Sequence, residues 1–159
     1  MKKIICVLMC CCLLLCSVSA FAANNNIIIN GEQVVIPADM GQVREVDNRL
    51  FVPLRFVTEF LGCVVNYQET ISTENGVNLL KRTATITNPE TGISYFVTVG
   101  DSKLFILTNT GAKIIKMDTK VFVNEEEGRM YVPLRFLAEA LNYTVSWDAA
   151  SQTASLSSN

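Results

Sequence analysis

The chain has 159 residues, half of them hydrophobic, and it contains no histidine. Histidine-based zinc or copper sites and Ser-His-Asp hydrolase triads are therefore excluded. The formal net charge is −2, which disfavours nonspecific binding to nucleic acid or to other polyanions.

The first 22 residues are typical of a secretory signal peptide. Lys2 and Lys3 form a positive n-region, and the stretch from Ile4 to Leu15 is an unbroken apolar run, too short to be a stable membrane span. Small residues follow, and cleavage is expected after Ala22. We therefore expect an exported chain with a charge of about −4 and no stable membrane insertion after cleavage. An uncleaved anchor and lipoprotein processing at Cys16 are the alternatives.

Five of the six cysteines lie in the predicted leader, so the mature chain keeps Cys63 alone. It can form neither an internal disulfide framework nor a thiolate metal cluster. We expect Cys63 to be a small buried apolar residue. The alternative, a nucleophile or an intermolecular disulfide, has no histidine to support it.

The mature chain opens with a predicted hairpin, in which residues 27–29 and 33–36 flank Asn30-Gly31. Residues 49–62, RLFVPLRFVTEFLG, then recur without a gap as residues 129–142, RMYVPLRFLAEALN, at an offset of 80. A repeat of this length predicts two structural units of similar design. We place them at residues 23–90 and 91–159.

Each copy of the repeated segment predicts a short strand followed by a short helix. Pro53 and Pro133 suit the helix start, and apolar residues at helical spacing extend to Leu61 and Leu141. Such helices of about two turns need packing against a sheet. Gly62 and Asn142 follow as C-terminal caps.

Alternating strands are predicted after each cap, and the remaining segments connect them. The strands cover residues 63–68, 83–87, 94–99, 143–148 and 153–157, and a second hairpin joins residues 104–107 and 113–117 through a three-residue turn at Asn109-Thr110-Gly111. The polar stretch Glu69 to Lys81 is expected to be a long hairpin loop. The run Glu125-Glu126-Glu127-Gly128 is read as a solvated turn, in preference to a calcium site that includes Asp118.

The Asn-Gly turn, the segment Val-Pro-Leu-Arg-Phe-x-x-Glu-x-Leu-Gly and the Val-x-Tyr/Trp strand resemble the copper amine oxidase N-terminal-like domain, also called the stalk domain. The core of this motif lies at residues 52–56 and 132–136. Departures are Asn142 in place of glycine, the turn at residues 109–111 and the enlarged segment 69–81. The resemblance implies exported proteins of Gram-positive bacteria and an α+β fold, with a twisted antiparallel sheet packed on one short helix in each of two tandem units.

The resemblance does not imply copper binding or amine oxidation, because the stalk domain of those oxidases lies apart from their catalytic domain. An oxidase centre needs three histidine ligands, which this chain lacks. We expect no cofactor, no metal and no catalytic residue.

The repeated arginine and glutamate favour structure over catalysis. Arg55 with Glu59, and Arg135 with Glu139, have the i, i+4 spacing of helix ion pairs. With Pro53 and Pro133 they form the predicted structural motif, and Arg135→Ala is expected to destabilise the fold more than it affects any ligand. Only partly buried, fully paired side chains would justify that role.

Tyr67 and Trp147 occupy matching strand positions. Buried packing is the favoured reading, and stacking on sugars or on a protein partner is the alternative if the rings are exposed.

These observations predict a non-catalytic binding or scaffolding module of the bacterial cell envelope, secreted or associated with the cell surface. Its partner is expected to be a cell-wall component or a secreted or surface protein, and the oligomeric state stays open. A carboxylate-dependent hydrolase of wall glycan, acting through Glu59 and Glu139, is the alternative. A structural subunit of a surface assembly is a third possibility.

Overall fold

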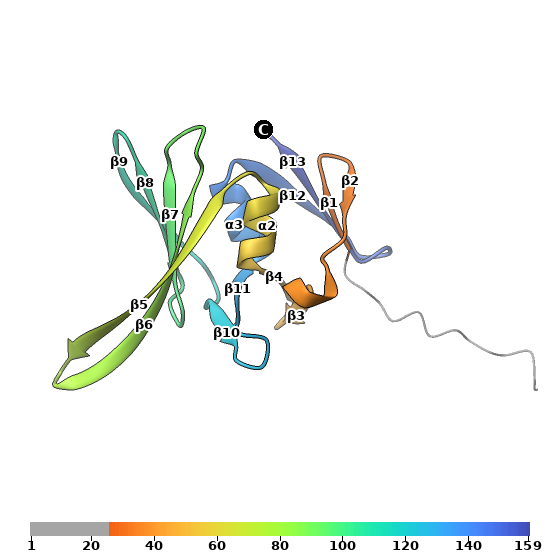
Figure 1. Cartoon of the computed structure of the whole chain (residues 1–159). Coiled ribbons are helices and arrows are strands. Elements are labelled where there is room, and N and C mark those ends of the chain that lie inside the picture. Colours follow the sequence, from red (N-terminus) through yellow and green to blue (C-terminus); the bar gives the residue numbers. More distant parts are fainter. Residues whose placement is uncertain (1–25) are drawn as a thin grey trace, which may run out of the picture.

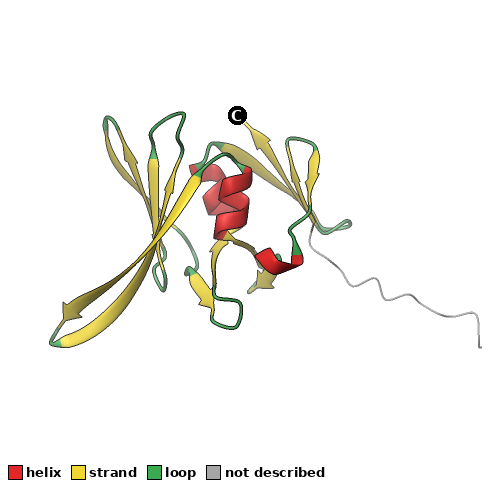
Figure 2. Ribbon diagram, viewed as in Figure 1, coloured by secondary structure: helices red, strands yellow, loops and turns green. Residues whose placement is uncertain are grey.

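The computed structural model describes residues 26–159, and the predicted signal peptide, residues 1–22, lies outside the described residues. The elements in chain order are β1 (Asn26–Ile29), β2 (Glu32–Val34), the 3-10 turn η1 (Ala38–Met40), β3 (Arg44–Val46), β4 (Arg49–Pro53), α2 (Leu54–Phe60), β5 (Val64–Glu74), β6 (Val77–Thr87), β7 (Ser94–Thr98), β8 (Lys103–Thr108), β9 (Gly111–Lys116), β10 (Phe122–Asn124), β11 (Arg129–Pro133), α3 (Leu134–Ala140), β12 (Tyr143–Asp148) and β13 (Thr153–Ser158). The predicted α+β class is confirmed (Figure 2).

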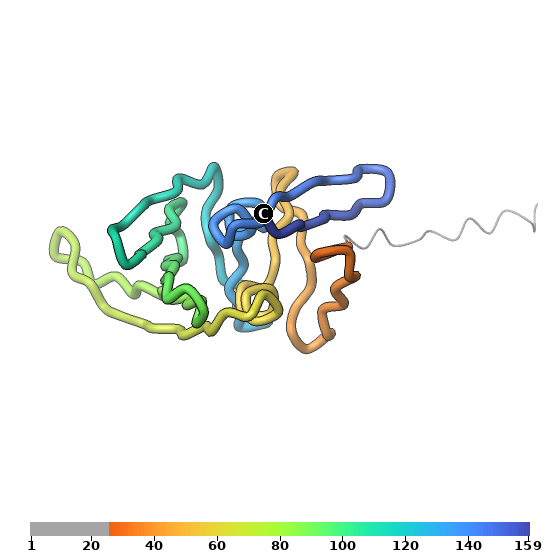
Figure 3. Tube along the Cα trace, turned by 90° about the horizontal axis from the view of Figure 1, so that it is seen from above, coloured from red at the N-terminus to blue at the C-terminus, as the bar shows by residue number. Residues whose placement is uncertain are grey.

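The described strands form three sheets, with the orders β12-β13-β1-β2, β10-β11-β4-β3 and β5-β6-β7-β8-β9. In Figure 1 both helices lie at the centre, with α2 in front of α3, between the five-stranded sheet and the β12-β13-β1-β2 sheet. The view from above shows the same succession (Figure 3). The core therefore sits around the helices, where the three sheets meet them.

The sheets are shared between the repeats, whereas the expected layout gave each repeat its own antiparallel sheet. Strand β1 pairs with β13 in parallel, and β6 pairs with β7, which continues into β8. Each repeat thus places its last hairpin against the first hairpin of the other repeat. The physical reason is that an isolated two-stranded hairpin is marginally stable and needs further strands. The boundary predicted after residue 90 falls between β6 and β7 and stays a prediction.

An internal two-fold relation runs through the central sheet. Strands β4 and β11 carry equivalent sequences, and they pair antiparallel with Val52 directly opposite Val132. These two valines are themselves equivalent positions of the repeat. The flanking pairs, Phe51 with Pro133 and Pro53 with Tyr131, are likewise equivalent to each other, so the middle of the fold resembles a symmetric dimer made within one chain.

The two helices begin and end as the repeated motif predicts. Pro53 and Pro133 are the N-cap residues, and seven helical residues follow in each copy. Gly62 and Asn142 both have positive φ, and their N–H groups donate to the carbonyls of Glu59 and Glu139 at 3.0 and 3.1 Å. Each helix buries one face in the core, which supplies the stability that two isolated turns lack.

The stretch Glu69 to Lys81, expected to be a long hairpin loop, is a hairpin, but its strands stay paired almost to the tip and form a protruding two-stranded ribbon. Strands β5 and β6 stay paired from Val64 with Thr87 as far as Glu74 with Val77. A two-residue turn at Asn75-Gly76 closes them, with φ of 51° and 78°. This dipeptide is a strong hairpin signal, so the loop prediction was wrong because polar composition was given more weight than turn chemistry.

The other hairpins agree more closely with expectation. Asn30-Gly31 joins β1 and β2 as predicted. Strands β8 and β9 are joined by two residues rather than three, because Thr108 pairs directly with Gly111. The prediction that Cys63 is buried is confirmed, and this burial raises the pKa of its thiol.

Candidate functional site

Two clefts of similar size flank the central sheet, with volumes of about 560 and 520 Å³. Residues that line the first, the Tyr67 cleft, include Pro53, Arg55, Phe56 and Tyr67 of the first repeat with Glu125 and Arg129 of the second. Residues that line the second, the Trp147 cleft, include Pro133, Arg135, Phe136 and Trp147 of the second repeat with Glu45 and Arg49 of the first. All six positions correspond at the offset of 80, so the internal two-fold relation produces two versions of one cleft.

In the Tyr67 cleft an arginine of the helix stacks on an aromatic ring of the next strand. Arg55 lies at the start of α2, and its Cζ atom is 4.8 Å from the centroid of the Tyr67 ring on β5. Tyr67 is 44% exposed, so the favoured expectation of a buried ring was wrong. Partial burial raises the pKa of the Tyr67 hydroxyl, and the Arg55 charge opposes that shift. The pair presents a flat, amphipathic surface to the cleft.

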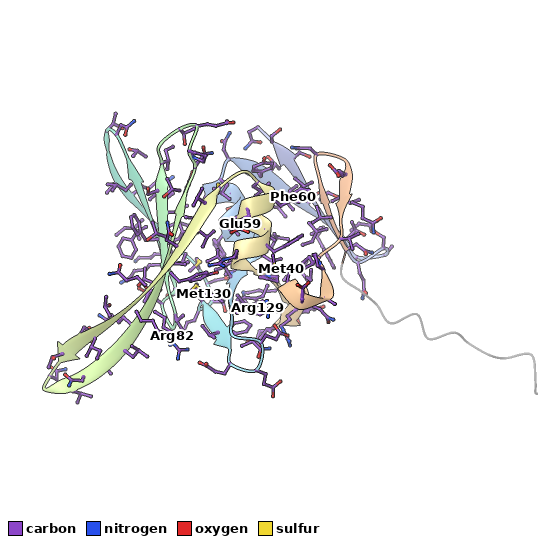
Figure 4. The ribbon with its side chains drawn as sticks, in the orientation of Figure 1. Met40, Glu59, Phe60, Arg82, Arg129 and Met130 are labelled. Carbon is purple, nitrogen blue, oxygen red and sulfur yellow. The ribbon has the colours of Figure 1, made fainter. Side chains whose placement is uncertain are left out.

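Arg82 forms two ion pairs beside the Tyr67 cleft, and one of them reaches the wall that the second repeat supplies. Arg82 of β6 contacts Glu69 of β5 at 3.1 Å and Glu125 of the β10–β11 turn at 2.6 Å. The second contact raises the pKa of the Arg82 guanidinium most, and it joins the two repeats. Figure 4 shows Arg82 on the ribbon, with Met40, Arg129 and Met130 near the lower end of α2.

The acidic run Glu125 to Glu127 lies in a turn, as predicted, but two of its carboxylates are engaged. Besides the contact of Glu125 with Arg82, Glu127 accepts a hydrogen bond of 2.5 Å from the Tyr131 hydroxyl and pairs with Arg44 of β3. The hydrogen bond from Tyr131 and the charge of Arg44 hold the pKa of Glu127 below its ordinary value. The prediction of a freely solvated turn was therefore incomplete, because Glu125 and Glu127 form ion pairs with arginines of the first repeat.

The Trp147 cleft has the same plan with fewer internal pairings. Trp147 of β12 is 42% exposed, so burial was the wrong expectation here too. Arg49 donates to the Asp118 carboxylate at 2.8 Å, which lowers the pKa of Asp118 and again links the two repeats. Among residues 26–159, Arg135 has no ion pair within 4.0 Å.

The predicted structural motif divides into buried and exposed members. Pro53 and Pro133 are buried. The Arg55 Nε atom lies 3.8 Å from Glu59 Oε1, and both side chains are about half exposed. The motif therefore does not meet the burial condition set for a large contribution to stability, and the structural role of Arg55, Glu59, Arg135 and Glu139 stays a prediction.

The carboxylates named for the alternative hydrolase do not form part of a common cleft. Glu59 lies on α2 and Glu139 on α3, both are exposed, and neither lines the Tyr67 or the Trp147 cleft. Within the described part of the chain, no three side chains of histidine, cysteine, aspartate or glutamate come together as a metal site. Neither α2 nor α3 approaches the length and hydropathy of a membrane span.

Sequence reasoning missed the far wall of each cleft, which comes from the other repeat. The signal was present in the repeat itself, because Arg49 and Arg129 open the two copies of the motif. The pairing of β4 with β11 brings each of these arginines into the cleft that the helix of the opposite copy lines.

A family model described as the copper amine oxidase N-terminal domain matches the chain twice, over residues 17–75 and 72–156. This domain is a non-catalytic, stalk-like part of those oxidases, and the double match confirms the predicted repeat. No curated protein matches the chain, and no solved structure matches it either.

Proposed function

Since the chain belongs to the copper amine oxidase N-terminal domain family, we propose that it is a non-catalytic extracellular module of the bacterial cell envelope that binds or scaffolds other components. Its partner is a cell-wall component or a secreted or surface protein. Export through cleavage after Ala22 is supported by the charged and apolar pattern of the leader.

The observation that carries the proposal is the pair of equivalent clefts. Each combines an apolar floor, a half-exposed aromatic ring and a few arginines and carboxylates, a composition suited to binding. An aromatic ring beside planar polar groups can stack on a sugar ring or on a side chain of a protein partner. Two such clefts on one chain let it hold two ligand segments at once, which suits a repetitive polymer.

Co-sedimentation of residues 23–159 with purified cell-wall sacculi tests the proposal, with membranes and soluble secreted proteins as separate comparisons. Saturable pelleting with sacculi is expected. Tyr67→Ala and Trp147→Ala should each weaken it, and the double variant should abolish it, because each removes the ring of one cleft. Phe105→Ala is the matched control, since Phe105 on β8 is an aromatic residue of similar exposure outside both clefts. Failure to bind sacculi or any secreted protein would contradict the proposal.

A further inference from the structure

The ribbon formed by the ends of β5 and β6 is an insertion that the second repeat lacks. Equivalent positions are 80 residues apart at Gly62 and Asn142 but 70 apart at Thr83 and Thr153, so the first repeat carries ten extra residues. Strand β7 pairs with β6 only from Thr83 to Thr87. Residues 69–82 therefore extend past the sheet as two strands alone (Figure 1).

The outer edge of β5 has few of the devices by which proteins protect a free strand. It has no partner beyond β6 among residues 26–159, and it is the longest edge strand of the three sheets. Its sequence, VVNYQETISTE, contains no lysine, arginine or proline, and its only charged residues are Glu69 and Glu74. The opposite edge of the same sheet, β9, carries Lys113 and Lys116, and β2, β3 and β10 have three residues each. The remaining edge strand, β12, has six residues against the eleven of β5. Edges are ordinarily blunted by such charges or by shortness.

Exposed aliphatic side chains lie along this unprotected ribbon. Ile71 is 72% exposed and Leu80 is 55% exposed, and the two are directly opposite each other across β5 and β6. They consequently share one face of the ribbon. An isolated ribbon of two strands with such a face is marginally stable in water, so a third strand along β5 would stabilise it.

The hairpin turn fixes which backbone groups of β5 are free. Because the turn has two residues, Glu74 and Val77 form the hydrogen-bonded pair next to it. The pattern alternates along an antiparallel ladder, so Glu69, Ile71 and Thr73 direct their N–H and C=O groups away from β6. A new strand would thus bond to these three residues.

We propose that this edge pairs antiparallel with the same edge of a second copy of the chain, with Ile71 on the two-fold axis. In that register Ile71 faces Ile71 of the second copy, and Glu69 faces Thr73. A row of four aliphatic side chains then crosses the joint sheet, with Leu80 of each copy at its ends. Three hydrogen-bonded residue pairs form, each exchanging two backbone bonds.

Charge and apolar contact together favour this register over its neighbours. A two-fold axis at Glu69 would oppose two carboxylates, which is unfavourable across strands. An axis at Thr73 would bring Ile71 against the turn residue Asn75 and lose the apolar row. With the axis at Ile71, Glu74 lies opposite Gln68 and no like charges meet. The chain already uses this kind of pairing internally, where Val52 faces Val132.

Sedimentation velocity of residues 23–159, which keep every described element, tests the proposal across a range of protein concentrations. The mass is expected to rise twofold with concentration. Ile71→Lys should return the protein to a monomer, because two ammonium groups would meet on the axis. Val77→Lys is the matched control: Val77 is also exposed at the ribbon tip, but it lies on β6 and on the other face, so the dimer should persist. A monomer at every concentration, or a dimer that survives Ile71→Lys, would overturn the proposal.

Cysteine cross-linking tests the register separately. Because Cys63 is buried, a thiol introduced on the ribbon is the accessible one in residues 26–159. Ile71→Cys is expected to give a disulfide-linked dimer with oxidised glutathione, whereas Val77→Cys should remain a monomer on a denaturing gel. Equal cross-linking of both variants would show that the register is wrong. The wild-type protein binding sacculi as a monomer would reject this proposal and leave the proposed function intact.

Discussion

The two repeats differ most where the chain leaves the helix, although the sequences of their helices and caps are very similar. In the second repeat the hairpin β12–β13 closes after Asp148, directly beside the Trp147 cleft. In the first repeat the hairpin β5–β6 continues to Asn75-Gly76 and adds Glu69 and Arg82 to the wall of the Tyr67 cleft. The repeated motif therefore gives both repeats the same packing, while the segment outside it gives each cleft a different surface.

The largest effect is expected from cutting the repeats apart. Residues 23–90 and 91–159, made separately, should lose the cooperative unfolding transition, because every described sheet takes strands from both. Mixing the two pieces should restore it. Circular dichroism during denaturant titration measures the outcome, with residues 23–159 as the control. A cooperative transition in either piece alone would contradict the interlaced description.

A second expected difference concerns Gly41, whose equivalent position in the second repeat is occupied by Val121. Gly41 has φ of 96°, and a Cβ atom there would lie 2.7 Å from the Tyr131 hydroxyl. Gly41→Ala should therefore cost about 3 kcal/mol of stability, from strain and overlap together. Gly31→Ala is the control, since Gly31 also has positive φ but no heavy atom within 4 Å. It should cost about 1 kcal/mol.

The equivalent of Tyr131 in the first repeat is Phe51, which lacks the hydroxyl. Combining Gly41→Ala with Tyr131→Phe should therefore recover part of the loss, because the closest contact is removed. Purely additive effects in this double-mutant cycle would show that the hydroxyl is not what requires glycine at position 41.

Lowering the pH should weaken the second-repeat turn through Glu127. Its pKa is lowered by the hydrogen bond from Tyr131 and by Arg44. A carboxylate of this kind stabilises the fold fully above its unfolded-state pKa, and the contribution is lost as pH falls through the lower folded-state value. Glu127→Gln should cost about 1 kcal/mol at neutral pH and progressively less in acid.

Denaturant midpoints measured from neutral to acid pH provide the readout for this effect. Asp47→Asn is the matched control, since Asp47 occupies the position equivalent to Glu127 in the first repeat. A cost of Glu127→Gln that does not change with pH would contradict the assignment.

The helix caps should respond in opposite directions. Gly62→Ala places a Cβ atom at φ of 77° and should cost about 1 kcal/mol, whereas Asn142→Gly should stabilise the fold by about 0.5 kcal/mol. Midpoints of denaturant unfolding at a constant m-value measure both changes. Equal effects of the same sign would show that the two caps do not have the same geometry.

The smallest effect is expected at the exposed arginines. Arg55→Ala removes the stacking on Tyr67 and a weak ion pair, and should cost about 0.5 kcal/mol. Arg135→Ala should cost less in stability, because no such contacts are observed for Arg135 in the described residues. Binding of both variants to sacculi separates a structural role from a ligand contact.

Much of the local structure could be predicted from the sequence because its determinants are local. Pro53, Gly62 and the apolar spacing between them define a helix of two turns without reference to the rest of the chain. The Asn-Gly turn at position 30 is equally self-contained, and the missed turn at Asn75 obeys the same rule.

The clefts could not be predicted in the same way because they depend on pairing between distant strands. Arg82 meets Glu125 and Arg44 meets Glu127 only after β4 and β11 have aligned the two repeats. The exposure of Tyr67 follows from the same arrangement. The residue pattern of one strand does not reveal whether another element of the fold covers its second face.

The parallel pairing of β1 with β13 determines how the fold carries mechanical load. Asn26 begins one strand and Ser158 ends its neighbour, and four residue pairs join them side by side. Tension that pulls these two ends apart acts along the strands, so the backbone hydrogen bonds between β1 and β13 are all loaded together in shear. The fold should therefore resist stretching between its ends by a high unfolding barrier, since forced rupture is set by the unfolding rate rather than by equilibrium stability.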